Sequence, residues 1–110
     1  MPLEDYLKFR NKKGKYKMNE KEQLYYLIDG LLNGNYNIKD FCDEFTRIYN
    51  LEIDYDVLSS VEYKCFSELS QMAARFSEYD EDLKIPNVYC SEDEIRDKTK
   101  NIEYTLHHSK

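Results

Sequence analysis

The chain has 110 residues, a formal net charge of −6 and a 41% hydrophobic composition, which fits one domain with a single core. No apolar run approaches the ~18–20 residues of a membrane span, and the N-terminus lacks the apolar stretch of a signal peptide. Composition therefore argues against a membrane protein, and we expect a cytoplasmic location.

The first segment of the chain, residues 1–18, is basic, whereas the rest is acidic. It holds six Lys or Arg and two acids, a net charge of +4, while residues 40–97 hold 16 acids and five bases. An acidic body of this kind repels nucleic acid and anionic membranes and attracts basic partners. We predict a basic arm or a short extra helix over residues 1–18, and a helical domain over residues 19–110 that binds neither nucleic acid nor membrane.

The first clear helix is predicted to begin after Asn19. Glu22 follows at the spacing of a capping box, and leucines and isoleucines then recur at helical spacing. Asn33 and Gly34 provide a stop signal. Gly30, inside the helix, indicates close packing against a neighbouring element.

The second helix is predicted to begin after Asn37 and to end near Asn50. Its apolar stripe steps by three and four residues: Ile38, Phe41, Phe45 and Ile48. The connection LEIDYD that follows could hold a few extended residues, but no second strand is available to pair with it.

The third helix is predicted to be the longest, from about Asp56 to Ser77, with Glu62 off its apolar stripe. The acidic stretch FSEYDEDL then places four carboxylates at its C-terminal end: Glu78, Asp80, Glu81 and Asp82. Exposed acids at a helix C-terminus oppose the helix dipole and cost about 0.3–1 kcal/mol each. Such a cost is common at functional sites and suggests a binding role for these acids.

The fourth helix is predicted to open at Ser91, with Glu94 completing a capping box. The acids of SEDE lie at the favoured end of a helix and need no functional explanation. Four amphipathic helices with short connections predict an all-α protein, an antiparallel up-and-down four-helix bundle.

The sequence argues against an enzyme. Its two histidines, His107 and His108, lie at the end of the chain, and three scattered glycines cannot form a phosphate loop. Two Asp-x-Asp pairs, at 54–56 and 80–82, lack the Gly and distal Glu of a calcium loop. We predict no catalytic residue, no metal and no cofactor. An odd set of three cysteines without CxxC spacing predicts free, reduced thiols.

What remains is an acidic surface interleaved with tyrosines. The candidate contact residues are Glu78, Tyr79, Asp80, Glu81 and Asp82, with Glu68, Asp54, Tyr55 and Asp56 as a second choice.

Three segments of the sequence resemble the colicin-D-type bacterial immunity proteins. They are YLIDGLLNGNYNIKDFCDEFTRIYN, FSELSQMAARFSEYDEDL and CSEDEIRDKTKNIEYTL, within roughly residues 24–106. The resemblance implies a small four-helix bundle that neutralises a tRNA-cleaving toxin, such as a colicin or a contact-dependent inhibition toxin. It further implies that acids around the end of the third helix enter the toxin's basic cleft and mimic RNA phosphates. Glu78, Asp80, Glu81 and Asp82 match that neighbourhood.

Two non-enzymatic functions are therefore open, with a third class less favoured. The first is an immunity protein that binds a cognate nuclease toxin one to one. The alternative is an acidic helical adaptor or antitoxin that binds a basic regulatory protein. A small enzyme or metal binder is the remaining possibility.

Overall fold

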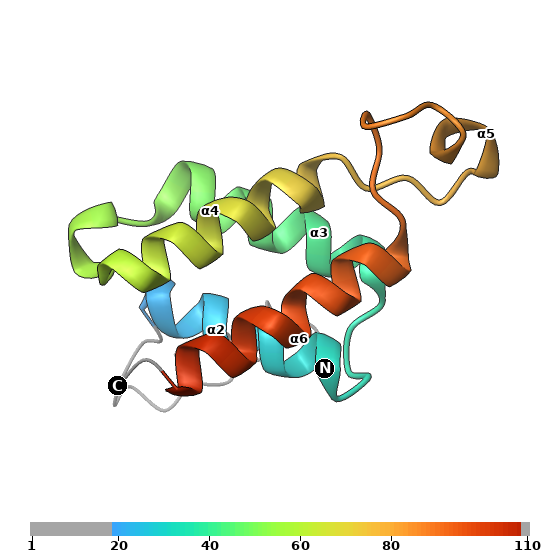
Figure 1. Ribbon diagram of the computed structural model, residues 1–110. Helices are drawn as coiled ribbons and strands as arrows, with labels where there is room; N and C mark the ends of the chain where they lie inside the picture. The colour runs from blue at the N-terminus through green and yellow to red at the C-terminus, as the bar shows by residue number, and fades with distance from the viewer. Residues whose placement is uncertain (1–18, 109–110) are drawn as a thin grey trace, which may run out of the picture.

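The computed structural model describes residues 19–108, and this part of the chain is helical (Figure 1). The α-helices are α2 (Glu20–Leu32), α3 (Ile38–Arg47), α4 (Ser60–Ala74), α5 (Asp80–Leu83) and α6 (Glu92–His108). A π-helix η1 (Ile48–Glu52) continues α3, and a 3-10 turn η2 (Tyr55–Val57) precedes α4. The predicted all-α class is confirmed for these residues. The predicted arm, residues 1–18, lies outside them.

Side-chain caps explain where the helices begin. At α2 the Asn19 carbonyl oxygen Oδ1 accepts from the Glu22 amide at 2.8 Å, and Glu22 accepts from the Asn19 amide at 3.3 Å. The same reciprocal bonds begin α4 at Ser59 and α6 at Ser91. Asn37 caps α3 through its side chain. The predicted starts of α2, α3 and α6 are thus confirmed.

The four longer helices, α2, α3, α4 and α6, pack around one core together with η1. Its largest fully buried side chains are Phe41, Phe45, Phe66, Leu24, Leu27, Ile28, Leu31, Ile48, Leu69, Ile95 and Thr99. Burial of this much apolar surface is the main source of stability, at roughly 25 cal/mol per Å² removed from water. We call α2, α3, η1, α4 and α6 the helical body.

Gly30 lies where α2 meets the turn that leads to α3. A Cβ atom there would come within 2.5 Å of the Tyr36 ring, closer than any side chain allows. The predicted close packing at Gly30 is confirmed, and its partner is the Tyr36 ring.

The third predicted helix was too long at both ends. Residues 56–59 belong to η2 and the cap of α4, and α4 ends at Ala74 with Arg75 as its C-cap. The second helix runs past its predicted end because η1 extends it to Glu52. Within LEIDYD the backbone is extended at Ile53 and Asp54, as the sequence allowed, while the residues on either side belong to η1 and η2.

Glu62 was predicted to face away from the core, but its side chain is buried. It accepts from the Tyr25 hydroxyl at 2.5 Å and the Ser59 amide at 2.9 Å, and it pairs with Lys21 at 3.0 Å. Burial alone would raise the Glu62 pKa, but the bonds from Ser59, Tyr25 and Lys21 outweigh burial and lower it. Glu62 therefore holds α2 and α4 together as a buried carboxylate.

Candidate functional site

A loop of residues 76–90 leaves the helical body after α4 and returns to it before α6; we call it the acidic loop. Two backbone hydrogen bonds close its base: the Cys90 amide donates to Arg75 O at 2.7 Å, and the Ser77 amide donates to Cys90 O at 3.0 Å. The loop carries α5 away from the body (Figure 1). Its two ends are thus held together while its tip projects.

Ser77 organises the first half of the acidic loop. Its buried hydroxyl donates to Asp82 Oδ2 at 2.7 Å and accepts from the Tyr79 amide at 3.1 Å. The α5 amide hydrogens of Asp82 and Leu83 bond to Tyr79 O. These bonds fold the tip into one helical turn and fix the direction of the Asp82 carboxylate.

The carboxylates were predicted to lie at the C-terminal end of a long helix, and this is wrong. Asp80, Glu81 and Asp82 form the first turn of α5, the end of a helix that favours negative charge. The chain breaks its helix at Arg75 because Phe76 pairs with Cys90 instead of continuing α4. The helix dipole thus gives no evidence that these acids cost folding energy.

The side chains of the loop tip are open to solvent. Glu78, Asp80 and Glu81 are exposed, and Tyr79 keeps 63% of its surface accessible. None of the four loop carboxylates forms an ion pair with a residue in the described range 19–108. Their charge is therefore not neutralised by the helical body.

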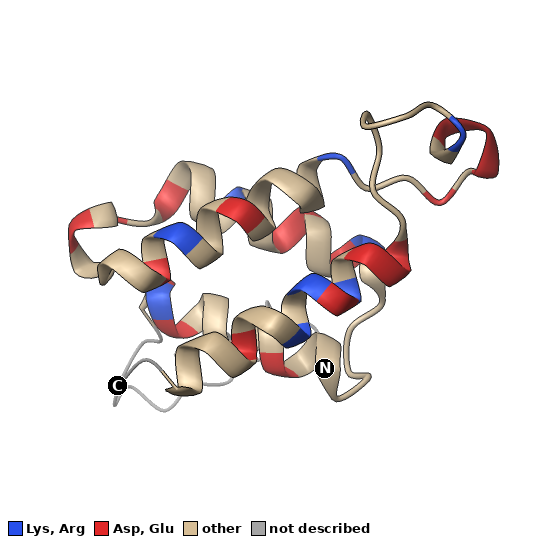
Figure 2. Cartoon of the chain, in the orientation of Figure 1, with Lys and Arg blue, Asp and Glu red and all other residues tan. Residues whose placement is uncertain are grey.

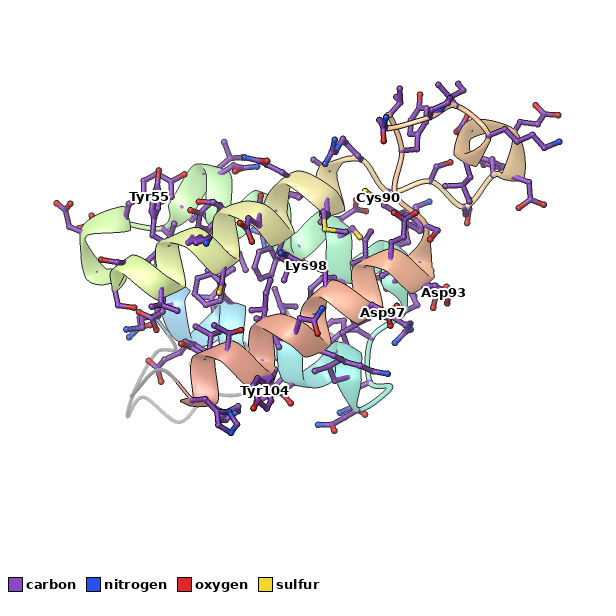
Figure 3. All side chains as sticks on the ribbon, in the orientation of Figure 1. Tyr55, Cys90, Asp93, Asp97, Lys98 and Tyr104 are labelled. Atoms are coloured by element: carbon purple, nitrogen blue, oxygen red, sulfur yellow. The ribbon has the colours of Figure 1, made fainter. Side chains whose placement is uncertain are left out.

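The start of α6 adds further acids to the same end of the molecule (Figure 2). Glu78 lines a hollow of about 330 Å³ together with Glu92 and Asp93, over apolar groups that include Ile38 and Phe76. Asp93 points outward at this end of α6 (Figure 3). We call the acidic loop together with residues 92–94 the acidic end.

The acidic end is strongly negative. Residues 76–94 contain seven acids and only one base, Lys84. The nearest arginine on α6, Arg96, is bound to Glu92 at 2.7 Å and to the Leu31 carbonyl at 3.1 Å. Charges so concentrated attract and orient a basic partner before contact.

The second choice of candidate residues does not join this site. Asp54, Tyr55 and Asp56 lie in and before η2, at the opposite end of the helical body from α5, where Figure 3 labels Tyr55. The Tyr55 hydroxyl donates to Tyr49 O at 2.9 Å, and its ring contacts Tyr63. One partner surface of ordinary size would not cover both ends at once.

Glu68 also stands apart from the acidic end, in the middle of α4. It accepts from Lys98 of α6 at 2.7 Å, and this bond lowers the Glu68 pKa. The pair borders a hollow of about 420 Å³ that also includes Lys64. The local charge is balanced, so Glu68 is a weaker candidate contact than the loop acids.

Among residues 19–108 no group of three or more His, Cys, Asp or Glu is placed to hold a metal ion. The three cysteines are free and buried, as predicted, and burial raises the pKa of the Cys42 thiol to about 12. No helix in this part of the chain is long and apolar enough to cross a membrane.

The sequence did not reveal that the start of α6 belongs to the site. Glu92 and Asp93 look like ordinary helix-start acids, and only the pairing of Cys90 with Arg75 and Ser77 brings them beside Glu78. A two-bond contact between irregular segments has no periodic signature in the sequence.

No family model, curated protein or solved structure matches this chain.

Proposed function

We propose that this protein is a non-enzymatic inhibitor of the immunity type, an antiparallel four-helix bundle whose acidic end binds a nuclease toxin. The toxin would be a basic domain that cleaves RNA, most consistently a tRNase. Binding at the basic cleft would exclude the RNA substrate, and the inhibitor would need no cofactor. The partner is a single toxin domain in a one-to-one complex.

The observation that carries the proposal is the anchored, projecting acidic loop. Its base is closed by two backbone hydrogen bonds, and its carboxylates are free of ion pairs within residues 19–108. A nuclease cleft is shaped and charged for a phosphate backbone. A narrow chain of carboxylates held away from the body offers such a cleft a comparable run of negative charge.

Tyr79 gives the loop a contact of a second kind. Its ring is largely exposed between Glu78 and Asp80, without support from the helical body. Binding energy at protein interfaces concentrates in a few aromatic and arginine anchors, while rim charges mainly govern association rate. We therefore assign Tyr79 the anchoring role and the neighbouring carboxylates the steering role.

The resemblance to colicin-D-type immunity proteins supports the same surface. It puts the toxin contact at the acids that follow the third long helix, which are those of the acidic loop. The two backbone hydrogen bonds at the base of the loop explain why these acids project from the helical body although α4 ends at Ala74.

The test is inhibition of the toxin domain encoded next to this gene. Native protein and the variant Glu78→Gln/Asp80→Asn/Glu81→Gln are compared for complex formation and for protection of tRNA from cleavage. The matched control is Asp29→Asn/Asp43→Asn/Glu103→Gln, which removes the same charge from other helices. We expect the loop variant to lose protection and the control to keep it. Failure of native protein to inhibit any neighbouring nuclease, with binding to a basic regulatory protein instead, would favour the adaptor function.

A further inference from the structure

The second half of the acidic loop differs in chemistry from the first. Residues 85–89 carry no charge, and we call them the apolar segment. Three of their side chains are open to solvent: Ile85, Val88 and Tyr89 keep 47%, 43% and 37% of their surfaces accessible. The projecting loop therefore presents carboxylates on one half and apolar groups on the other.

The apolar segment does not serve the core. Within residues 19–108, neither the buried core nor the half-buried apolar side chains packed against it include any residue of this segment. Packing inside the protein therefore does not explain why these positions are apolar. Exposed apolar groups gathered in one segment commonly mark a docking surface.

The backbone holds the apolar segment in a defined shape. The ring of Pro86 fixes its own φ, and Asn87 takes a φ of 63°, a left-handed conformation that few residues other than Gly and Asn adopt readily. The segment then returns to the helical body at Cys90, whose amide and carbonyl are both hydrogen-bonded. A segment that is ordered in advance loses less conformational freedom when it binds.

A hollow of about 350 Å³ lies between the apolar segment and the end of α4. Ile85 and Tyr89 line it on the loop side, and Met72 and Arg75 line it on the α4 side. The hollow gives room for side chains of a partner that packs against the apolar segment.

The charges around the apolar segment select its partner. Acids precede it at residues 78–82 and follow it at residues 92–94, and Glu94 also lines the hollow. Nucleic acid, an anionic membrane or a second copy of this chain, with its net charge of −6, would be repelled here. A basic protein would be attracted.

We infer that the apolar segment is a second contact with the basic nuclease toxin domain and packs against apolar groups beside its cleft. The inference rests on the function proposed above and adds a division of labour within the acidic loop. The carboxylates speed association, whereas the apolar segment slows dissociation, because burial of apolar groups acts after the encounter.

The test is the kinetics of binding to the toxin domain encoded next to this gene. Ile85→Ser/Val88→Ser is compared with native protein and with the matched control Leu51→Ser/Val57→Ser, which changes exposed apolar residues at the opposite end of the helical body. We expect the loop variant to dissociate about 10-fold faster, with a near-native association rate and salt dependence, and the control to behave as native. Tyr89→Ser is a second loop variant and should show the same pattern. Circular dichroism and the melting temperature check that each variant keeps the fold.

Three outcomes would overturn the inference. Native dissociation rates in both loop variants, with slow association of Glu78→Gln/Asp80→Asn/Glu81→Gln, would refute the apolar contact and leave the proposed function standing. Absence of binding by native protein would refute both. A dimer of native protein that Ile85→Ser/Val88→Ser disrupts would assign the segment to a second copy of the chain.

Discussion

Replacing Glu62 by Gln should destabilise the protein in a way that depends on pH. The native carboxylate accepts from Tyr25 and Ser59 and pairs with Lys21. Hydrogen bonds to a charged group contribute about 1.5–3 kcal/mol, against about 0.5–1.5 kcal/mol for neutral ones. Gln keeps the shape of the side chain but removes its charge. The ion pair with the partly exposed Lys21 adds little to the stability, because solvent screens it. We expect a loss of about 1–3 kcal/mol in unfolding free energy at pH 7.

The sign of the pH dependence follows from the lowered Glu62 pKa. A carboxyl whose pKa is lower in the folded state stabilises the fold above its ordinary pKa. This contribution is lost as the pH falls through the folded-state pKa. The stability difference between native protein and Glu62→Gln should therefore be largest near pH 7 and shrink toward pH 3.

The assay is urea unfolding followed by circular dichroism at 222 nm, at both pH values. Glu68→Gln is the control, because its exposed pairing with Lys98 is worth below about 1 kcal/mol. A Glu62→Gln penalty that is absent at pH 7, or equal at pH 3 and pH 7, would refute the role given to this carboxylate.

Three further predictions test other parts of the structure. Gly30→Ala should cost about 1–3 kcal/mol, because the new methyl group overlaps the Tyr36 ring, and thermal melting should show it; an unchanged melting temperature would contradict this packing. Ser77→Ala should speed hydrogen exchange at the Tyr79 amide with little effect on amides in the helical core, since it removes the bonds to Tyr79 and Asp82; unchanged exchange would mean that Ser77 does not order the loop. The melting temperature should be the same with and without reductant, because the described cysteines are free; a drop on reduction would reveal a disulfide.

Much of the helical framework could be predicted from the sequence because its signals are local. The capping residues Asn19 and Ser91 and the apolar spacing of α2, α3 and α6 act within a few residues of chain. The apolar spacing of the third helix predicted both of its ends wrongly, because apolar residues such as Val57 and Phe76 continue that spacing beyond α4.

The candidate site was predicted less well because its geometry depends on contacts between distant residues. The acids from Glu78 to Asp82 could be chosen as candidates because they crowd together in the sequence. The hydrogen bonds that hold their loop to the helical body could not be predicted. Cys90 pairs with Arg75 and Ser77 across more than ten residues, and this turns a supposed helix end into a projecting loop. The burial of Glu62 was missed for a similar reason, because its partner Tyr25 lies 37 residues away.

Association kinetics at several salt concentrations give the sharpest test of whether the acidic end binds a basic nuclease toxin. Native protein is compared with Glu78→Gln/Asp80→Asn/Glu81→Gln and with the control Asp29→Asn/Asp43→Asn/Glu103→Gln, all against the same toxin domain. Exposed charges are screened over about 8–10 Å at physiological salt, so native association should slow as salt is added. We expect slower, less salt-dependent association for the loop variant alone. Equal rates and salt dependence for all three proteins would contradict it.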